Sequence, residues 1–183
     1  MPDHRLTPLT PLGRAMPETD TIGPVTITEN TSVALASLAT RKGREADVAK
    51  AAKTLHIALP SPGRATETAL WLGPDQWLIE APYDAHEDIV AYLKPAFQDA
   101  ASITEQTDAW VRFDLAGPNL HVLFELLCNL DTRAMQPGHA TRTVIDHLGC
   151  YVACRSNGFT MLGPRSSAKS LHHALITAAK SAC

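Results

Sequence analysis

The sequence predicts an α+β domain made of two fused split β-α-β (ferredoxin-like) halves. Three observations carry this prediction. Short segments of strand-like alternation occur along the whole chain, and helical apolar periodicity separates them at regular intervals. The expected order is βαββαβ followed by βαβββα, so the second half repeats the first in topology though not visibly in sequence. No linker rich in Gly or Ser divides the 183 residues, which favours one shared core.

Residues 1–24 are expected to form an extended arm, because five prolines exclude a continuous helix there. Two alternatives stay open for this arm. It is either disordered, or Leu6, Leu9 and Leu12 lie along a groove on another subunit. The remaining residues, 25–183, are predicted to form the single α+β domain.

The first half, about residues 25–107, is expected to hold two helices between short strands. Apolar residues spaced three and four apart predict a helix over 44–56, and Asp84 with Glu87 forms a capping-box pattern that predicts a second helix start. Pro95 should kink or end that second helix. The strands expected in this half are 25–28, 32–39, 66–72, 76–80 and 102–106.

The second half, about residues 108–183, begins with a clearly alternating strand over 110–115. Gly117-Pro118 then opens a helix whose apolar stripe includes Leu120, Leu123 and Phe124. Ser166 or Ser167 is expected to cap a final helix. The other strands expected here are 141–148, 150–155 and 158–162.

Composition excludes several function classes. The formal net charge of −3 and the pI near 6.2 give no basic field for nucleic acid. Aromatic residues make up 5% of the chain, which argues against a free-standing flavoprotein. Four cysteines do not make a disulfide framework, and neither a leader nor an apolar run of roughly 20 residues is present. We therefore expect a cytoplasmic chain with free thiols and no membrane partner.

Cysteine and histidine spacing does not point to a metal site. Cys150 and Cys154 share one face of a predicted strand near His147, but residues four apart on a strand lie roughly 13 Å apart, so buried structural cysteines are expected. His172 and His173 diverge by about 100° on a helix, so at most one of them faces inward. An autonomous hydrolase that uses a histidine remains a minor alternative.

Two polar segments carry the remaining candidate chemistry. Asp108 and Asp114 flank a strand, and either could supply a carboxylate to a pterin ring. Residues 128–133 follow a helix, and they are interpreted as a helix C-cap with an exposed ion pair. The alternative for this segment is a loop that recognises a partner or an anion through Arg133.

Several stretches resemble the gamma subunit of heterotetrameric sarcosine oxidase. They are Leu-Thr-Pro-Leu at 6–9, the strand pair at 70–78, and 126–131 through the Thr-Arg-Thr at 141–143. The resemblance covers nearly the whole chain and is weakest over 58–66. It implies a bacterial complex of alpha, beta, gamma and delta subunits that oxidatively demethylates sarcosine to glycine. The products are hydrogen peroxide with formaldehyde or, with tetrahydrofolate, methylene-tetrahydrofolate.

The resemblance also implies where the chemistry of that complex lies. FAD, FMN and NAD belong to the alpha and beta subunits, and zinc belongs to the delta subunit. The gamma subunit has no catalytic motif, so no catalytic, cofactor-binding or metal residue is carried over. Its fold is similar to the folate-binding region of the aminomethyltransferase of the glycine cleavage system.

Two functions follow as hypotheses. The first is a non-catalytic assembly subunit that contacts mainly alpha, and the second is a folate-binding module of a one-carbon transfer enzyme. The residues expected at the subunit interface are Leu6, Leu9, Leu12, Asn129, Asp131 and Arg133.

Overall fold

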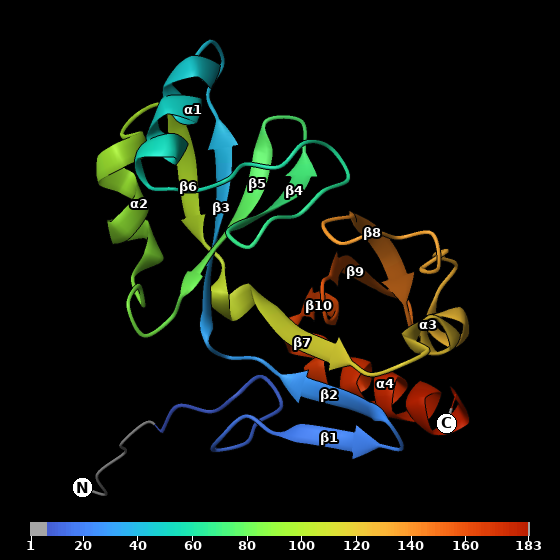
Figure 1. The fold of residues 1–183 in the computed structure, drawn as a ribbon. Helices are drawn as coiled ribbons and strands as arrows, with labels where there is room; N and C mark the ends of the chain where they lie inside the picture. Colours follow the sequence, from blue (N-terminus) through green and yellow to red (C-terminus); the bar gives the residue numbers. More distant parts are fainter. Residues whose placement is uncertain (1–6, 183) are drawn as a thin grey trace, which may run out of the picture.

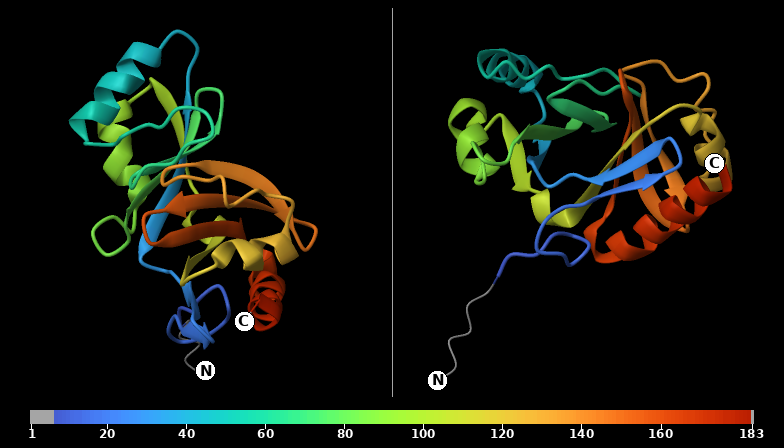
Figure 2. Two further views of the ribbon diagram at one scale, coloured as in Figure 1. Left: turned by 45° about the vertical axis from the view of Figure 1, so that its right-hand side comes forward. Right: turned by 60° about the horizontal axis from the view of Figure 1, so that its bottom comes forward.

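The computed structural model describes residues 7–182, so Leu6 lies outside the described residues. Two antiparallel sheets meet, and each is covered by two helices on its outer face (Figures 1 and 2). The four-stranded sheet has the order β4 (Ala69–Gly73), β5 (Gln76–Pro82), β3 (Val33–Thr40), β6 (Ala101–Glu105). The six-stranded sheet has the order β1 (Thr19–Ile22), β2 (Val25–Glu29), β7 (Trp110–Ala116), β10 (Gly158–Pro164), β9 (Leu148–Arg155), β8 (Ala140–Ile145).

The helices bury the apolar stripes that the sequence predicts. They are α1 (Glu45–Thr54), α2 (Ile89–Phe97), α3 (Leu120–Leu127) and α4 (Ala168–Ala182), with short 3₁₀ turns η1 (Thr107–Ala109) and η2 (Arg165–Ser167). Helices α1 and α2 pack on the four-stranded sheet, and α3 and α4 pack on the six-stranded sheet. None of the helices among residues 7–182 is both long and apolar enough to cross a membrane.

From β3 onward the first half follows the predicted order, β3-α1-β4-β5-α2-β6. The strand expected over 25–28 in this half is β2, which belongs instead to the six-stranded sheet because it pairs with β7. The strand order of the four-stranded sheet is that of a split β-α-β unit, in which each helix crosses over one intervening strand. The second helix differs in its start: α2 begins at Ile89 rather than near Asp84. The side chain of Asp88 accepts a hydrogen bond from the Ala91 amide at 2.9 Å, so Asp88 is the cap. Pro95 lies inside the helix, which ends two residues later at Phe97.

The second half keeps the predicted order β7-α3-β8-β9-β10-α4, but its last three strands pair as a meander. The strand expected over 141–148 ends at Ile145. Asp146 and His147 have φ of 48° and 65°, the left-handed values of a two-residue hairpin turn, so Leu148 already belongs to β9.

The N-terminal arm belongs partly to the folded core. Thr19–Ile22 pairs with β2 as β1, and β2 pairs in turn with β7 of the second half. Leu12 is 6% exposed within the core under α4, and its amide donates to a Glu29 carboxylate oxygen at 2.8 Å. The described part of the arm is therefore a loop and an edge strand of the six-stranded sheet.

The inner faces of the two sheets meet through a small apolar cluster. Leu35, Leu70 and Leu78 from the four-stranded side contact Ala153 and Leu162 from the six-stranded side. The buried residues of this cluster are all leucines and alanines, which form an apolar contact between the two sheets. Beside this cluster the contact between the sheets becomes polar, and the charged side chains described next lie there.

Candidate functional site

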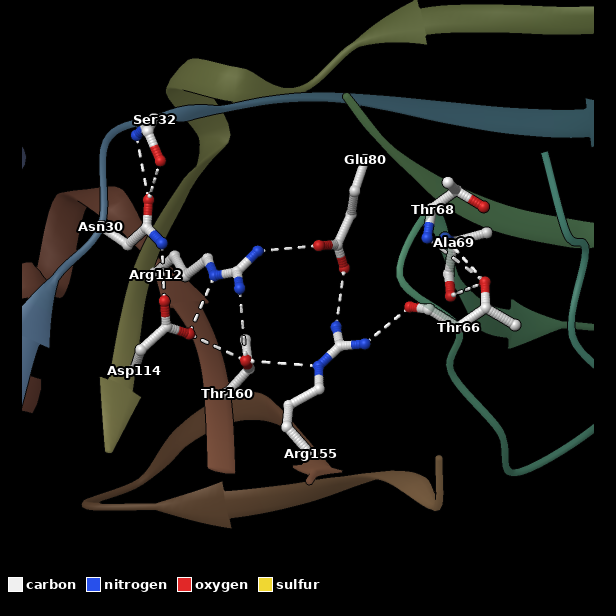
Figure 3. A network of polar contacts seen from close by, with 10 residues as sticks. All are labelled: Asn30, Ser32, Thr66, Thr68, Ala69, Glu80, Arg112, Asp114, Arg155 and Thr160. Atoms are coloured by element: carbon white, nitrogen blue, oxygen red, sulfur yellow. Dashed lines mark hydrogen bonds and ion pairs between the residues drawn. The ribbon is translucent and has the colours of Figure 1, made fainter. Parts of the chain in front are cut away.

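Strand periodicity places three charged residues between the sheets. On β5, Ile79 points to the helices of its own half, and Glu80 on the opposite face points to the six-stranded sheet. On β7, buried Phe113 faces α4, whereas its neighbours Arg112 and Asp114 face the other way. Figure 3 shows these side chains converging with Arg155 and Thr160, which come from β9 and β10.

Glu80 is the centre of this network. Its side chain is 5% exposed, and its two carboxylate oxygens accept from different arginines. Arg112 donates from Nη1 at 2.8 Å, and Arg155 donates from Nη2 at 3.3 Å (Figure 3). One carboxylate on β5 therefore joins the four-stranded sheet to two strands of the six-stranded sheet.

The other guanidinium nitrogens of the two arginines also donate hydrogen bonds. Arg112 donates from Nε to Asp114 at 3.0 Å, and Arg155 donates from Nη1 to the backbone oxygen of Thr66 at 2.6 Å. Both guanidinium groups reach the Thr160 hydroxyl at 3.4 Å. The network thus consists of two cations and two carboxylates whose charges balance.

Asp114 is held by three donors. Its Oδ1 accepts from Arg112 and from the Thr160 hydroxyl, the latter at 2.8 Å, and its Oδ2 accepts from the Asn30 amide at 2.6 Å. Asn30 is fixed in turn, because its own oxygen accepts from the backbone amide and the hydroxyl of Ser32. A carboxylate offers about four acceptor positions, so Asp114 keeps about one for any further donor.

Burial and charge act in opposite directions on Glu80. Burial raises the pKa of its carboxyl above the usual value, while the charges of Arg112 and Arg155 oppose that rise. Each carboxylate oxygen faces a guanidinium, which can only donate hydrogen bonds. A proton on Glu80 would have no acceptor among these partners, so the geometry favours the ionised form.

A cavity of about 510 Å³ opens beside the network on the inner face of the six-stranded sheet. We call it the sheet-face cavity. Its polar lining combines Thr26 and Thr28 from β2 with Arg112 and Asp114 from β7, and the exposed Glu67 comes from the loop before β4. Its size is that of a small-molecule site, but both of its arginines are already bonded to carboxylates of the chain.

The two aspartates proposed as pterin ligands lie in different surroundings. Asp114 lines the sheet-face cavity, whereas the Asp108 side chain is 84% exposed and its carboxylate lies 3.3 Å from Arg165 Nη1. Only Asp114 therefore belongs to the network.

The predicted interface residues also separate. Leu9 is 54% exposed, while Leu12 is buried in the core of its own chain and offers no side-chain surface to a partner. Asn129, Asp131 and Arg133 are exposed, as an interface turn requires. Arg133 Nη2 lies 2.8 Å from Glu125 Oε1, and both side chains of this ion pair are at least half exposed.

Burial of the two cysteines and the inward position of one of the two adjacent histidines agree with the expectations from spacing. Cys150 and Cys154 are buried, and His147 is exposed in the β8–β9 turn. Among residues 7–182 no group of three metal-ligating side chains gathers. His172 faces inward, 2.7 Å from Asp20 and stacked near Phe113, whereas His173 is exposed. Burial raises the pKa of the Cys150 thiol to about 11.

Sequence reasoning missed Glu80, Arg155 and Thr160 as parts of one site. A signal existed at Glu80, because this charged residue directly follows the apolar run Trp77-Leu78-Ile79 within a predicted strand. In the structure Leu78, Ile79 and Glu80 are all buried. No pattern in the sequence indicated that three different strands bring these side chains together.

Comparisons with known proteins show the fold. No family model and no curated protein matches the sequence. The chain is similar to heterotetrameric sarcosine oxidase from Corynebacterium sp. U-96, with 21% identity and a TM-score of 0.73 over 90% of this chain and 88% of that chain. It is also similar to the glycine cleavage system aminomethyltransferase T from Bartonella henselae, with 14% identity and a TM-score of 0.56. That match covers 83% of this chain and about half, 48%, of the aminomethyltransferase.

Proposed function

We propose that this chain is the gamma-type subunit of a heterotetrameric sarcosine oxidase and supports assembly of that complex without a catalytic site of its own. The observation that carries the proposal is the reciprocal match to one sarcosine oxidase chain, which covers about nine tenths of both chains. The match to the aminomethyltransferase covers about half of that protein. This favours a fold shared with one part of the aminomethyltransferase over equivalence of the two whole proteins.

The polar network supports a structural role for the charged residues. The arginines and carboxylates between the sheets bind one another and leave little capacity for a substrate. Side chains bonded in this way hold two sheets in a fixed relation, which is what a scaffold for partner subunits needs. In this proposal FAD, FMN and NAD are bound by alpha and beta and zinc by delta, and alpha is the main contact.

Co-expression tests this function directly. The full chain carries an affinity tag and is produced together with alpha, beta and delta subunits of a heterotetrameric sarcosine oxidase from the same organism. We expect the tagged chain to retain a flavin-absorbing complex that oxidises sarcosine. A tagged chain that elutes alone, while the other three subunits assemble without it, would overturn the proposal.

The contact surface is tested with two exposed leucines. Leu9 on the arm and Leu126 on α3 are 54% and 56% exposed, so replacing either by Ser removes apolar surface without touching the core. We expect Leu9→Ser to weaken capture of the partner subunits, because the arm is a predicted contact. Equal capture by the parent and Leu9→Ser would remove the arm from the interface, and Leu126→Ser serves as the matched comparison.

A second function, folate binding in one-carbon transfer, rests on the sheet-face cavity and the aminomethyltransferase fold. A pterin ring needs a carboxylate that can accept two hydrogen bonds, and Asp114 already accepts three. The function therefore ranks second. Calorimetric titration of the full chain with tetrahydrofolate tests this second function. Binding heat that disappears in Asp114→Asn would favour folate binding, and no heat at millimolar tetrahydrofolate would exclude folate binding.

A further inference from the structure

We infer that the chain binds a small organic oxyanion, a carboxylate or a phosphate ester, in a second cavity at the start of α3. This cavity, of about 510 Å³, lies on the other side of the β9–β10 turn from the sheet-face cavity. We call it the α3 cavity. Anion binding in this cavity goes beyond the proposed assembly role and does not depend on that role.

The charge of the lining is one-sided. The α3 cavity is lined by Arg133, Arg155, His121, Thr132, Ser156 and Asn157 together with apolar side chains, and none of its lining residues is Asp or Glu. The sheet-face cavity has the same volume but contains Asp114 and Glu67 in its lining, so the two cavities differ in charge. Such a lining attracts an anion and offers hydrogen-bond donors to its oxygens.

The first turn of α3 adds free backbone donors. Asn119 precedes the helix in the left-handed conformation, and no side chain of the described residues caps the helix start. The first turn contains no acidic residue. Gly117, Leu120 and His121 at this start line the cavity, so the unpaired amides and the positive end of the helix lie at its wall.

Thr132 supplies an independent observation. Its side chain lines the cavity and is only 6% exposed, yet its hydroxyl has no hydrogen-bond partner among the described residues. Native proteins rarely leave a buried hydroxyl unpaired, because desolvation without a partner is unfavourable. A bound oxyanion would provide the missing acceptor after rotation of the Thr132 side chain about χ1.

Arg133 is the cation that can reach the ligand. Arg155 is held by Glu80, Thr66 and Thr160. The Arg133 side chain, in contrast, is 62% exposed, and its one ion pair within residues 7–182 is with the exposed Glu125. Exposed pairs of this kind contribute little, so Arg133 can exchange Glu125 for a ligand oxyanion at small cost. Met135 and Phe159 provide an apolar wall for the organic part of the ligand.

The experiment is an NMR titration of the full ¹⁵N-labelled chain at constant ionic strength, with benzoate in one arm and phenyl phosphate in the other. We expect saturable shifts of the Leu120 and His121 amides below about 10 mM, in the range of a millimolar dissociation constant. The stronger arm identifies the headgroup. The absence of shifts in both arms would overturn the proposal.

Four variants locate the binding. Arg133→Gln should weaken binding roughly tenfold, because it removes a charge-assisted hydrogen bond. Thr132→Val keeps the shape, leaves no group unpaired in the empty chain and should weaken binding about threefold. Glu125→Gln should tighten binding by up to about threefold, because it releases Arg133. Arg142→Gln, at an exposed arginine of β8 outside the cavity, is the matched control and should leave binding unchanged.

Two other outcomes would contradict the inference. Equal weakening by Arg133→Gln and Arg142→Gln would mean diffuse surface attraction. Loss of partner-subunit capture in Arg133→Gln, with neither probe bound by the parent chain, would mean that the cavity receives an acidic side chain of a partner.

Discussion

Replacing Glu80 by Gln tests whether the buried network holds the two sheets together. Gln keeps the volume of Glu but removes the charge that faces Arg112 and Arg155. Arg112 would keep Asp114 as a partner, whereas Arg155 would have no carboxylate within the described residues. The Arg155 side chain is 11% exposed, so its charge would remain buried and uncompensated.

Breaking a buried ion pair by removing one partner costs about 3–5 kcal/mol. We expect Glu80→Gln to lower the free energy of unfolding by that amount, a large share of the roughly 5–15 kcal/mol that stabilises a domain. The measurement is urea unfolding at pH 7, followed by far-UV circular dichroism and by tryptophan fluorescence. Trp110 packs against Tyr151 beside the contact between the sheets, so its emission reports on that contact.

Glu67→Gln is the matched control, because Glu67 is exposed at the rim of the same region. Its effect should stay within about 0.5 kcal/mol. The double variant Glu80→Gln with Arg155→Gln should lose less than the sum of the two single variants, since the second change removes the stranded charge. A loss of less than about 1 kcal/mol in Glu80→Gln, or strict additivity in the double variant, would refute the reasoning.

Three further results are expected. The pKa of Cys150 is about 11 in the folded chain and 9.0 in the unfolded chain. The stabilising contribution of the neutral thiol should therefore be complete below pH 9 and decline between pH 9 and 11. Cys150→Ala should make the free energy of unfolding depend less on pH over this range. Gly158→Ala should lower the free energy of unfolding by at least about 2 kcal/mol, because Gly158 has a φ of +150° and a Cβ there would lie 1.9 Å from the Leu115 oxygen. In the control Gly73→Ala the new Cβ meets no atom within 4 Å, so the loss should be much smaller. Asp88→Ala should cost about 1 kcal/mol in thermal or urea unfolding by removing the cap of α2, and an unchanged midpoint would contradict that role.

Local patterns predicted most of the fold because each depends on a short stretch of chain. The alternation of residues 110–115 and the apolar stripe of α3 appear as expected. The predicted start of α2 at Asp84 was wrong, because Asp84 and Asp88 both precede possible helical turns. Only the path of the chain after β5 decides which of the two aspartates caps the helix. The turn at Asp146 and His147 was missed because neither residue is Gly, the usual signal for left-handed turn positions.

The candidate site was less predictable because it depends on the arrangement of the sheets. The alternation identified Asp114 as facing away from the helices, but its partners Asn30 and Thr160 are 84 and 46 positions away in the sequence. The cavity at the start of α3 depends likewise on β9 residues meeting the turn that holds Arg133. Sequence periodicity predicts which face of a strand a residue occupies, but it does not predict which strand lies beside that strand in the sheet.

The placement of β2 has a consequence for how the chain folds. Thr26 pairs with Ala116, 90 positions later, so the six-stranded sheet is completed only after the whole four-stranded half has been synthesised. Pairings so distant in sequence are slow to form, because the entropy of closing the loop is lost before the contacts are gained. The four-stranded half has local connections and can form first, which brings residues 25–29 close to 110–116. A fragment that begins at residue 108 would lack both β1 and β2, and we expect it to recover its fold only when a separate fragment of residues 1–107 is added.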